Sequence, residues 1–323
     1  GPIVIADFDG DGSEDALVAA ADPAGRGRTR LLLNRGGNKF AEASTESLAA
    51  SPALAGSASA GDFDGDGRAD VFIGSRVAPG RYPQPGRSAL WLNRGERFED
   101  ASALLPNEGE LGLVAGSLWS DVDGDGWLDL LVSLEWGPVR CYRNLEGERF
   151  EDRTEEWGFA SAGSGLWSCM ASGDFNGDGR PDFAVGNLGL NTPYQADAEE
   201  PAVLYYGDFG GRGPFQIVEG RYESGRLAPW RSRKELGEAV PSVLQRFPSN
   251  DAYAAATLEE IVGAKALAGA RRLEASELRS GAFLSGSDGK YRFEPFARIS
   301  QIAPIQGLAV ADFDGDGNMD LAA

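Results

Sequence analysis

Short apolar runs, separated by polar turns, recur along the whole chain. Each run is only three or four residues long and directly precedes or follows an acidic segment that contains glycine. Runs of this length flanked by turn residues are typical of buried strands rather than of buried helices. The runs are Ile3–Ala6, Ala16–Ala19, Val71–Ile73, Leu130–Val132, Phe183–Val185 and Leu308–Ala311. The pattern therefore predicts that each acidic segment is a loop joining two buried strands.

A second recurring pattern predicts β-hairpins. In four places an apolar run is followed by a polar turn with glycine and then by another apolar or aromatic residue. The segments are Leu33–Phe40, Leu92–Phe98, Tyr142–Phe150 and, with a weaker signal, Phe283–Phe293. This order is typical of two antiparallel strands joined by a tight turn. One repeating unit is then a strand, an acidic loop, a second strand and a hairpin, which makes four strands.

The acidic loops share the motif D-x-D-G-D-G-x-x-D. Copies begin at Asp7, Asp62, Asp121, Asp174 and Asp312, and in the fourth copy Asn176 replaces the second aspartate. Four carboxylates within nine residues repel one another unless a cation neutralises them, and Ca²⁺ accepts six to eight oxygen ligands in a flexible geometry. The spacing resembles the first half of an EF-hand loop, although strands rather than helices flank it. An acidic turn that binds nothing is the alternative, but five copies with the same glycine placement favour a metal site.

Side chains at positions 1, 3, 5 and 9 and the carbonyl at position 7 are the predicted ligands. The side-chain ligands are Asp7, Asp9, Asp11, Asp15, Asp62, Asp64, Asp66, Asp70, Asp121, Asp123, Asp125, Asp129, Asp174, Asn176, Asp178, Asp182, Asp312, Asp314, Asp316 and Asp320. The carbonyl ligands belong to Ser13, Arg68, Trp127, Arg180 and Asn318. We expect about five Ca²⁺ ions per chain, with a structural rather than a catalytic role, because one short loop supplies each ligand set.

The spacing of the copies predicts a β-propeller. The first four copies begin 55, 59 and 53 residues apart, a period that suits a four-stranded blade. We predict an all-β propeller of six or seven blades, with seven favoured, which forms a single domain over residues 1–323. The longer gap before Asp312 contains a decayed copy, Asp208–Gln216, which keeps Gly211 and Gly213 but has lost three carboxylates. There Arg212 takes the place of the cation, so no metal is expected.

Residues 231–280 differ in composition and predict a helical insertion. Helices are expected at Asp251–Val262 and Lys265–Leu278, and Thr257 and Glu260 have the spacing of a capping box. The favoured interpretation is a helical cap packed on the propeller rim. The alternative is a surface that docks a partner through a basic patch. That patch would contain Arg231, Arg233, Lys234, Arg271 and Arg272.

Charge and composition narrow the function classes. The formal net charge is −20, and 19 of the acidic residues are the motif aspartates of the five copies. Five Ca²⁺ ions would halve that charge, and a chain this acidic argues against nucleic acid as a partner. No run is long and apolar enough to insert into a membrane. The chain has no histidine, which removes the Ser-His and Cys-His nucleophile pairs and the usual zinc site. Cys141 and Cys169 are either a disulfide or two buried thiols.

These residues resemble a known family. Ala6–Gly12 and its copies resemble the FG-GAP/VCBS repeat of integrin-α-like β-propellers. The Asn-Arg-Gly hairpins and Gly186–Asn191 are similar to bacterial VCBS proteins related to the cartilage acidic protein family. The resemblance implies a propeller with calcium bound by the motif aspartates, and Asn176 and the loop at Asp208 depart from that pattern. Such propellers serve several functions, so the resemblance specifies the fold and the metal better than the function.

Three functional hypotheses follow. The first is a non-enzymatic, calcium-stabilised propeller that binds a protein or glycan in adhesion or surface assembly. It would act extracellularly, at the cell surface or in the periplasm, where calcium is about millimolar. The second is a polysaccharide lyase or hydrolase that uses Tyr82, Arg81, Tyr194 and Glu135, although these are more readily explained as packing or solvated residues. The third is a self-assembling subunit of a surface filament.

The last repeat has no hairpin in this sequence. Only Leu321–Ala323 follows the final loop, and a sheet with an unpaired edge favours pairing with another strand. We expect strands beyond Ala323 to complete this blade or, failing that, strands donated by a neighbouring chain. The step of 34 residues from Asp174 to Asp208 also leaves that unit short of a hairpin. No signal peptide is recognisable, which suits a mature or trimmed form.

Overall fold

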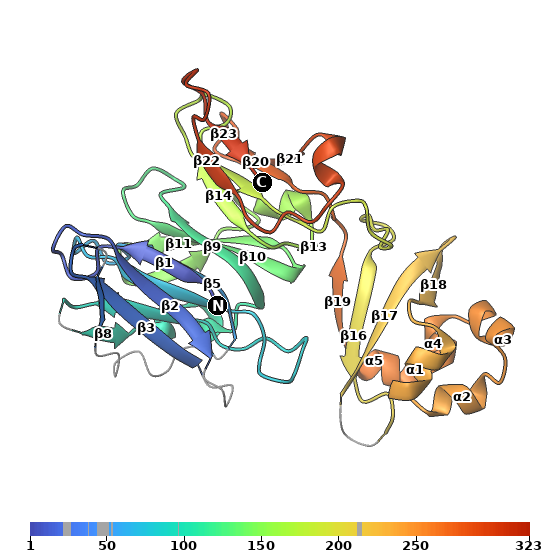
Figure 1. Ribbon diagram of the computed structural model, residues 1–323. Coiled ribbons are helices and arrows are strands. Elements are labelled where there is room, and N and C mark those ends of the chain that lie inside the picture. The colour runs from blue at the N-terminus through green and yellow to red at the C-terminus, as the bar shows by residue number, and fades with distance from the viewer. Residues whose placement is uncertain (22–26, 38, 44–51, 53, 96, 212–214) are drawn as a thin grey trace.

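The computed structural model describes residues 1–21, 27–37, 39–43, 52, 54–95, 97–211 and 215–323. These residues form an all-β architecture of antiparallel sheets with a few short helices (Figure 1). The first sheet has the order β1 (Ile3–Ala6), β2 (Asp15–Ala21), β3 (Gly27–Asn34) and β4 (Phe40–Glu42). The second has the order β5 (Ala55–Gly61), β6 (Asp70–Ser75), β7 (Ala89–Asn93) and β8 (Phe98–Asp100). In the third, β9 (Leu113–Ser120), β10 (Asp129–Gly137), β11 (Val139–Leu145) and β12 (Arg149–Asp152) pair in turn, and β13 (Gly165–Leu166) also pairs with β10.

The fourth sheet takes its two halves from distant parts of the chain. Its order is β14 (Met170–Gly173), β15 (Asp182–Val185), β20 (Gly281–Ser285) and β21 (Tyr291–Pro295). The predicted hairpin Phe283–Phe293 therefore completes the unit that begins at Asp174, which explains why the 34 residues after Asp174 contain no hairpin. A separate pair, β22 (Ala309–Ala311) and β23 (Asp320–Ala322), follows at the C-terminal end.

The segment inserted between β15 and β20 has its own sheet. The strand order is β18 (Arg226–Pro229), β17 (Gln216–Glu223), β16 (Ala202–Gly207) and β19 (Arg271–Ala275). Figure 1 shows this sheet and the helices to one side of the other sheets. The helices are α1 (Arg233–Ala239), α2 (Ser242–Arg246), α3 (Asn250–Ala255), α4 (Leu258–Val262) and α5 (Ala264–Gly269). Short 3-10 turns lie at Ser102–Leu104, Pro106–Gly109, Phe159–Ala162 and Arg298–Gln301.

Two predicted helix boundaries are wrong. The helix predicted to run from Lys265 to Leu278 ends at Gly269, because the backbone of β19 pairs with β16 instead of continuing the helix. The helix predicted over Asp251–Val262 is two helices, since Thr257 begins a new one as its N-cap. The predicted capping box between Thr257 and Glu260 is confirmed, with both reciprocal hydrogen bonds formed.

The apolar cores lie between consecutive sheets. The runs Val71–Ile73 of β6 and Leu130–Val132 of β10 are buried at every residue, which is why they are continuously apolar rather than alternating. Phe72 and Leu90 of the second sheet pack with Leu130 and Val132 of the third, and the other adjacent sheets meet in the same way. The first strands lie side by side, β1 with β5, β5 with β9, β9 with β14 and β14 with β22. The acidic loops that begin at these strands are thereby lined up along the stack.

The structure confirms the strands and hairpins predicted from the apolar runs. The turn residues Asn38 and Glu96 of two of these hairpins lie outside the described residues. Among the described residues no sheet closes on itself, and ring closure and the number of blades stay predictions. Within the same ranges, no helix has the length and apolar character needed to cross a bilayer. Cys141 and Cys169 are free thiols rather than a disulfide.

Candidate metal centres and a central pocket

Each acidic loop is a tight turn held by its own first aspartate. In loop 1 (Asp7–Asp15), the amides of Gly10 and Gly12 donate to the two carboxylate oxygens of Asp7, each at 2.8 Å. Gly10 and Gly12 have φ values of 75° and 85°, which a residue with a side chain rarely adopts. The same bonds from the sixth-position glycine form in loop 2 (Asp62–Asp70), loop 3 (Asp121–Asp129), loop 4 (Asp174–Asp182) and loop 5 (Asp312–Asp320). The motif glycines are therefore required for the turn itself.

The turns bring carboxylate oxygens together in four of the five loops. Within each group one oxygen per residue lies within 4.8 Å of the others. The groups are Asp7, Asp9 and Asp15; Asp62, Asp64 and Asp66; Asp121, Asp123 and Asp129; and Asp312, Asp314 and Asp316. In loop 2, Oδ1 of Asp64 is buried and has no hydrogen-bond partner, an arrangement that a bound cation would satisfy. An all-oxygen donor set of this kind fits Ca²⁺. The complete ligand sets stay predictions.

The aspartate at position 9 has a structural role that the sequence did not reveal. Asp129 is fully buried, its Oδ2 accepts from the amide of Val122 at 3.0 Å, and its Oδ1 accepts from the amide of Asn144 at 2.8 Å. It thereby ties the start of the loop to the third strand of its sheet. The corresponding residues in loops 1, 2 and 4 make the same pair of bonds; they are Asp15, Asp70 and Asp182.

A side chain from the next sheet holds each of the first three loops. Asn93 donates through Nδ2 to the carbonyl of Phe8 at 2.9 Å, and Asn144 donates to the carbonyl of Phe63 at 2.8 Å. In the fourth sheet Ser285 stands at the asparagine position, and Tyr291 Oη instead donates to the carbonyl of Val122 at 3.4 Å. Sequence reasoning missed these bonds, although the recurring asparagine in the predicted hairpins was a usable signal.

Burial and neighbouring carboxylates shift two of the position-9 pKa values upward. Burial raises the pKa of Asp129 to about 7 and that of Asp70 to about 6, although backbone hydrogen bonds act in the opposite direction. Both values lie above the roughly 3.9 of an aspartate in the unfolded chain. Their contribution to the stability of the metal-free fold is therefore full at low pH, falls as pH rises above about 3.9, and is lost once pH has passed through their folded pKa values of about 6 and 7.

We expect the metal-free protein to be less stable at pH 8 than at pH 5, by about 4 kcal/mol. Urea unfolding in excess chelator at the two pH values measures this difference. Calcium favours the ionised carboxylates, so the calcium-loaded protein serves as the control and should lose little or no stability over the same range. A metal-free protein that gains stability between pH 5 and pH 8 would contradict the assignment.

Loop 4 is held by hydrogen bonds that the other loops lack. The hydroxyl of Ser285 donates to Asp178 Oδ2 at 2.7 Å, and this bond, with help from Arg180, lowers the pKa of Asp178 to about 2. Asn176 donates through Nδ2 to the carbonyl of Ser285 at 3.1 Å. Loop 4 therefore has the amide of Asn176 in place of a carboxylate, and this amide also connects the loop to β20.

The decayed loop at Asp208 has a glutamine where the other loops have their ninth-position aspartate. It joins β16 to β17, and Gln216 Oε1 accepts from the amides of Phe209 and Gly210 at 2.8 Å and 3.1 Å. Gln216 thus makes the bond that the ninth-position aspartate makes in the other loops. Arg212 and Gly213 lie outside the described residues, and the absence of metal at this loop stays a prediction.

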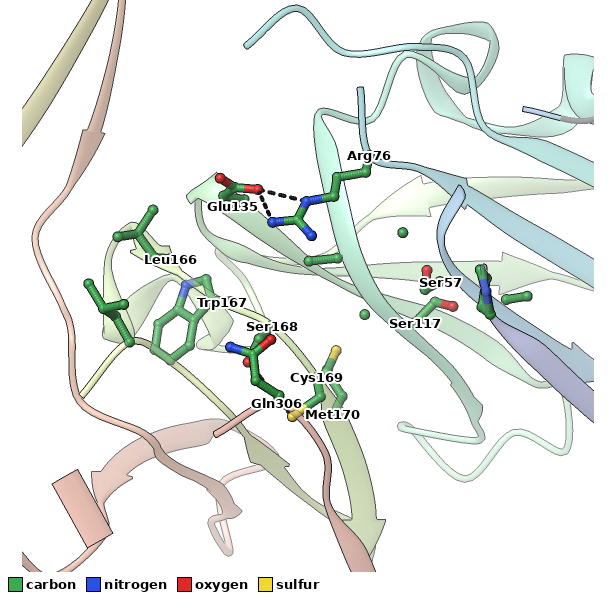
Figure 2. A pocket seen from close by; sticks show the side chains of 16 residues that line it. Ser57, Arg76, Ser117, Glu135, Leu166, Trp167, Ser168, Cys169, Met170 and Gln306 are labelled. Carbon is green, nitrogen blue, oxygen red and sulfur yellow. Dashed lines mark hydrogen bonds and ion pairs between the residues drawn. The ribbon is translucent and has the colours of Figure 1, made fainter. Parts of the chain in front are cut away.

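A pocket of about 460 Å³ lies among the first strands of the second, third and fourth sheets. Residues of β5, β9 and the segment from Leu166 to Met170 line it. Figure 2 shows Arg76 and Glu135 facing each other in this pocket, and Arg76 Nη2 lies 2.8 Å from Glu135 Oε2. Trp167 and Cys169 also line the pocket.

The four proposed catalytic residues are only partly brought together. Tyr82 Oη donates to Glu135 Oε1 at 2.8 Å. Burial is the larger cause, and the negative charge of Glu135 the second, of a raised pKa at Tyr82. Tyr194 instead donates to Glu219 at 3.0 Å and stacks on Trp230. A tyrosine with a raised pKa is a poor general base near neutral pH. Arg81 lines a different hollow with Tyr82.

The predicted basic patch is divided between two places. Arg231, Arg233 and Lys234 line a hollow of about 450 Å³ beside α1. Arg271 lines a separate hollow and lies over the ring of Tyr206, and Arg272 forms an ion pair with Glu274. The helices themselves bury Leu236, Val243, Leu258 and Ile261 against the inserted sheet. They cover that sheet, and a partner-docking role for the patch stays a hypothesis.

Comparison with known proteins supports one family. A family model described as FG-GAP-like repeat matches residues 7–73, which contain loops 1 and 2, and residues 121–185, which contain loops 3 and 4. The match supports the FG-GAP repeat family for this chain. The predicted closer relationship of these FG-GAP-like repeats to bacterial VCBS proteins and the cartilage acidic protein family stays a prediction.

Other comparisons add little. None of the curated proteins matches the chain. A solved structure titled "Structure of a Xanthomonas Type IV Secretion System related protein" aligns with 13% identity over 71% of this chain and 93% of its own, with a TM-score of 0.24. A likeness of this degree carries no argument about fold or function.

Proposed function

We propose that the protein is a non-enzymatic, calcium-stabilised β-propeller that binds a protein or glycan in adhesion or surface assembly. The observation that carries this proposal is the repeated turn in which motif aspartates converge on one point. FG-GAP-like repeats are consistent with a propeller-like adhesion or binding domain. When bound, about five Ca²⁺ ions would neutralise the carboxylates and fix the loops, while the position-9 aspartates hold loops 1 to 4 to their sheets. Calcium near millimolar concentration suits an extracellular, cell-surface or periplasmic location.

The arrangement of the first strands supports a propeller. They lie side by side, and β5, β9 and β14 line one central pocket, as innermost strands of neighbouring blades would. Phe313 of loop 5 is 59% exposed, whereas Phe63 at the same motif position is fully buried. A further blade, or a blade from a second chain, would cover Phe313. The same exposed face supports the alternative of a self-assembling surface subunit.

An enzyme that cleaves polysaccharides is the remaining alternative. Glu135 lies in the central pocket and contacts both Arg76 and Tyr82, which brings an acid, an arginine and a tyrosine together. Each of these groups, however, already has an intramolecular partner, and the pKa of Tyr82 is shifted in the wrong direction for a base.

A panel of neutral and acidic polysaccharides separates binding from cleavage. The protein is incubated with each polysaccharide in calcium, and binding is followed together with the release of reducing and unsaturated ends. We expect binding, if any, without new ends. Catalytic release of ends that Glu135→Gln abolishes would overturn the non-enzymatic proposal.

A further inference from the structure

Arginine side chains contact the carboxylates of four of the acidic loops. From the hairpins, Arg35 Nη1 lies 2.9 Å from Asp9 in loop 1, and Arg94 Nη1 lies 2.5 Å from Asp64 in loop 2. These residues follow the asparagine in the motif Asn-Arg-Gly. In loop 3, Arg143 pairs with Asp123 at 2.7 Å and with Asp125 at 2.8 Å.

The number of arginines differs from loop to loop. Loop 2 has a second one, Arg68, which pairs with Asp66 from inside the loop. Loop 4 has only the equivalent internal residue, Arg180, which lies 3.0 Å from Asp178. Among the described residues no lysine or arginine pairs with loop 5, although that loop has a full set of four aspartates. Loop 2 thus has two guanidinium groups beside its four carboxylates, whereas the four carboxylates of loop 5 have no guanidinium group beside them in the described part of the chain.

In loop 2 the arginine and a cation would use different oxygens of the same carboxylate. Arg94 contacts Oδ2 of Asp64, while Oδ1 of the same carboxylate is buried without a hydrogen-bond partner. The arginine therefore orients the Asp64 carboxylate and leaves its Oδ1 available for a cation. Its positive charge nevertheless repels a divalent ion held a few ångströms away, and the Arg94 side chain is 32% exposed, so solvent screens the repulsion incompletely.

We propose that these arginines grade the calcium affinity of the loops, so that loop 5 binds most tightly and loop 2 least tightly among the four-aspartate loops. The inference rests on the proposed calcium binding. The arginines act as built-in counter-charges that let loops 1 to 3 keep their shape when calcium falls, at the expense of affinity. Loop 5 has no such counter-charge and depends most on the ion.

Trp127 makes loops 2 and 3 observable apart from the others. It is part of loop 3, and its ring also packs on loop 2, where a Cβ added to Gly65 would lie 3.0 Å from Cζ3. Excitation of this tryptophan should sensitise the luminescence of Tb³⁺ bound in either loop. The test measures the calcium concentration that displaces half of the sensitised Tb³⁺, and calorimetry with calcium gives the total binding.

We expect Arg94→Gln to raise the calcium affinity of the sensitised sites about tenfold, or about 1.4 kcal/mol. Arg94→Lys keeps the charge and should leave the affinity within about twofold of the natural protein. The matched control is Arg140→Gln. Arg140 lies on the same strand as Arg143, but it pairs with Asp152 and not with an acidic loop. Melting in saturating calcium shows that each variant is folded.

The outcomes separate the two proposals. A natural protein that binds no calcium refutes the calcium proposal and this inference with it. A natural protein that binds calcium, with Arg94→Gln unchanged or weakened relative to Arg140→Gln, overturns the inference alone. Equal gains in Arg94→Gln and Arg94→Lys would show that loss of the hydrogen-bonding fork, rather than of the charge, changes the affinity, and would also overturn it.

Discussion

Removing calcium is expected to lower the melting temperature of the protein by on the order of 15 °C. Each occupied loop contributes about 2 kcal/mol when calcium is twentyfold above its dissociation constant, and several loops lose this contribution together. The carboxylates that converge in loop 5 then repel one another without a counter-ion, and in loops 1 to 3 the paired arginines offset this repulsion only in part. Because each loop is tied to a buried strand, the repulsion acts on the sheets and not only on the turns.

Differential scanning calorimetry in calcium and in excess chelator measures this effect. Adding calcium back should restore the original transition, and Mg²⁺ should restore little, because it requires a tighter octahedral site and releases its waters reluctantly. A melting temperature that does not change in chelator would show that the loops do not hold a stabilising ion.

Asn144→Ala should destabilise the calcium-loaded protein by about 3 kcal/mol. The side chain is fully buried and donates to the carbonyls of Phe63 and Leu128, while its Oδ1 accepts from the amide of Gly147 at 2.9 Å. The substitution leaves all three backbone groups without this partner and removes a bond that joins loop 2 to the third sheet.

Asn34→Ala is the matched control for this substitution. Asn34 occupies the same position in the first sheet, but it is only partly buried and donates to the carbonyl of Glu14 in its own sheet at 3.1 Å. Its loss should cost about 1 kcal/mol. Urea midpoints of the two variants in calcium give the comparison, and equal losses would argue against an inter-sheet role for Asn144.

The sequence predicts the repeating unit well because that unit is local. The motif glycines, the apolar runs such as Leu130–Val132 and the hairpin turns each lie within about a dozen residues, so their backbone requirements are visible in the pattern. The convergence of Asp7, Asp9 and Asp15 follows from one turn. The site could therefore be located before the fold was known.

Non-local pairing accounts for what the sequence analysis missed. The hairpin that completes the fourth sheet lies about a hundred residues from β15, and nothing in the local pattern links Phe183 to Phe283. Residues Arg271–Ala275 have helical spacing, yet the free edge of β16 pairs with them as a strand. The bonds from Asn93 and Asn144 cross between sheets, so only the recurrence of asparagine hinted at them.

Metal analysis of the dialysed protein tests the central claim most directly. Native mass spectrometry and elemental analysis together give the number of calcium ions bound per folded chain. The account predicts about five, one for each of the loops beginning at Asp7, Asp62, Asp121, Asp174 and Asp312. A count of two or fewer would contradict it.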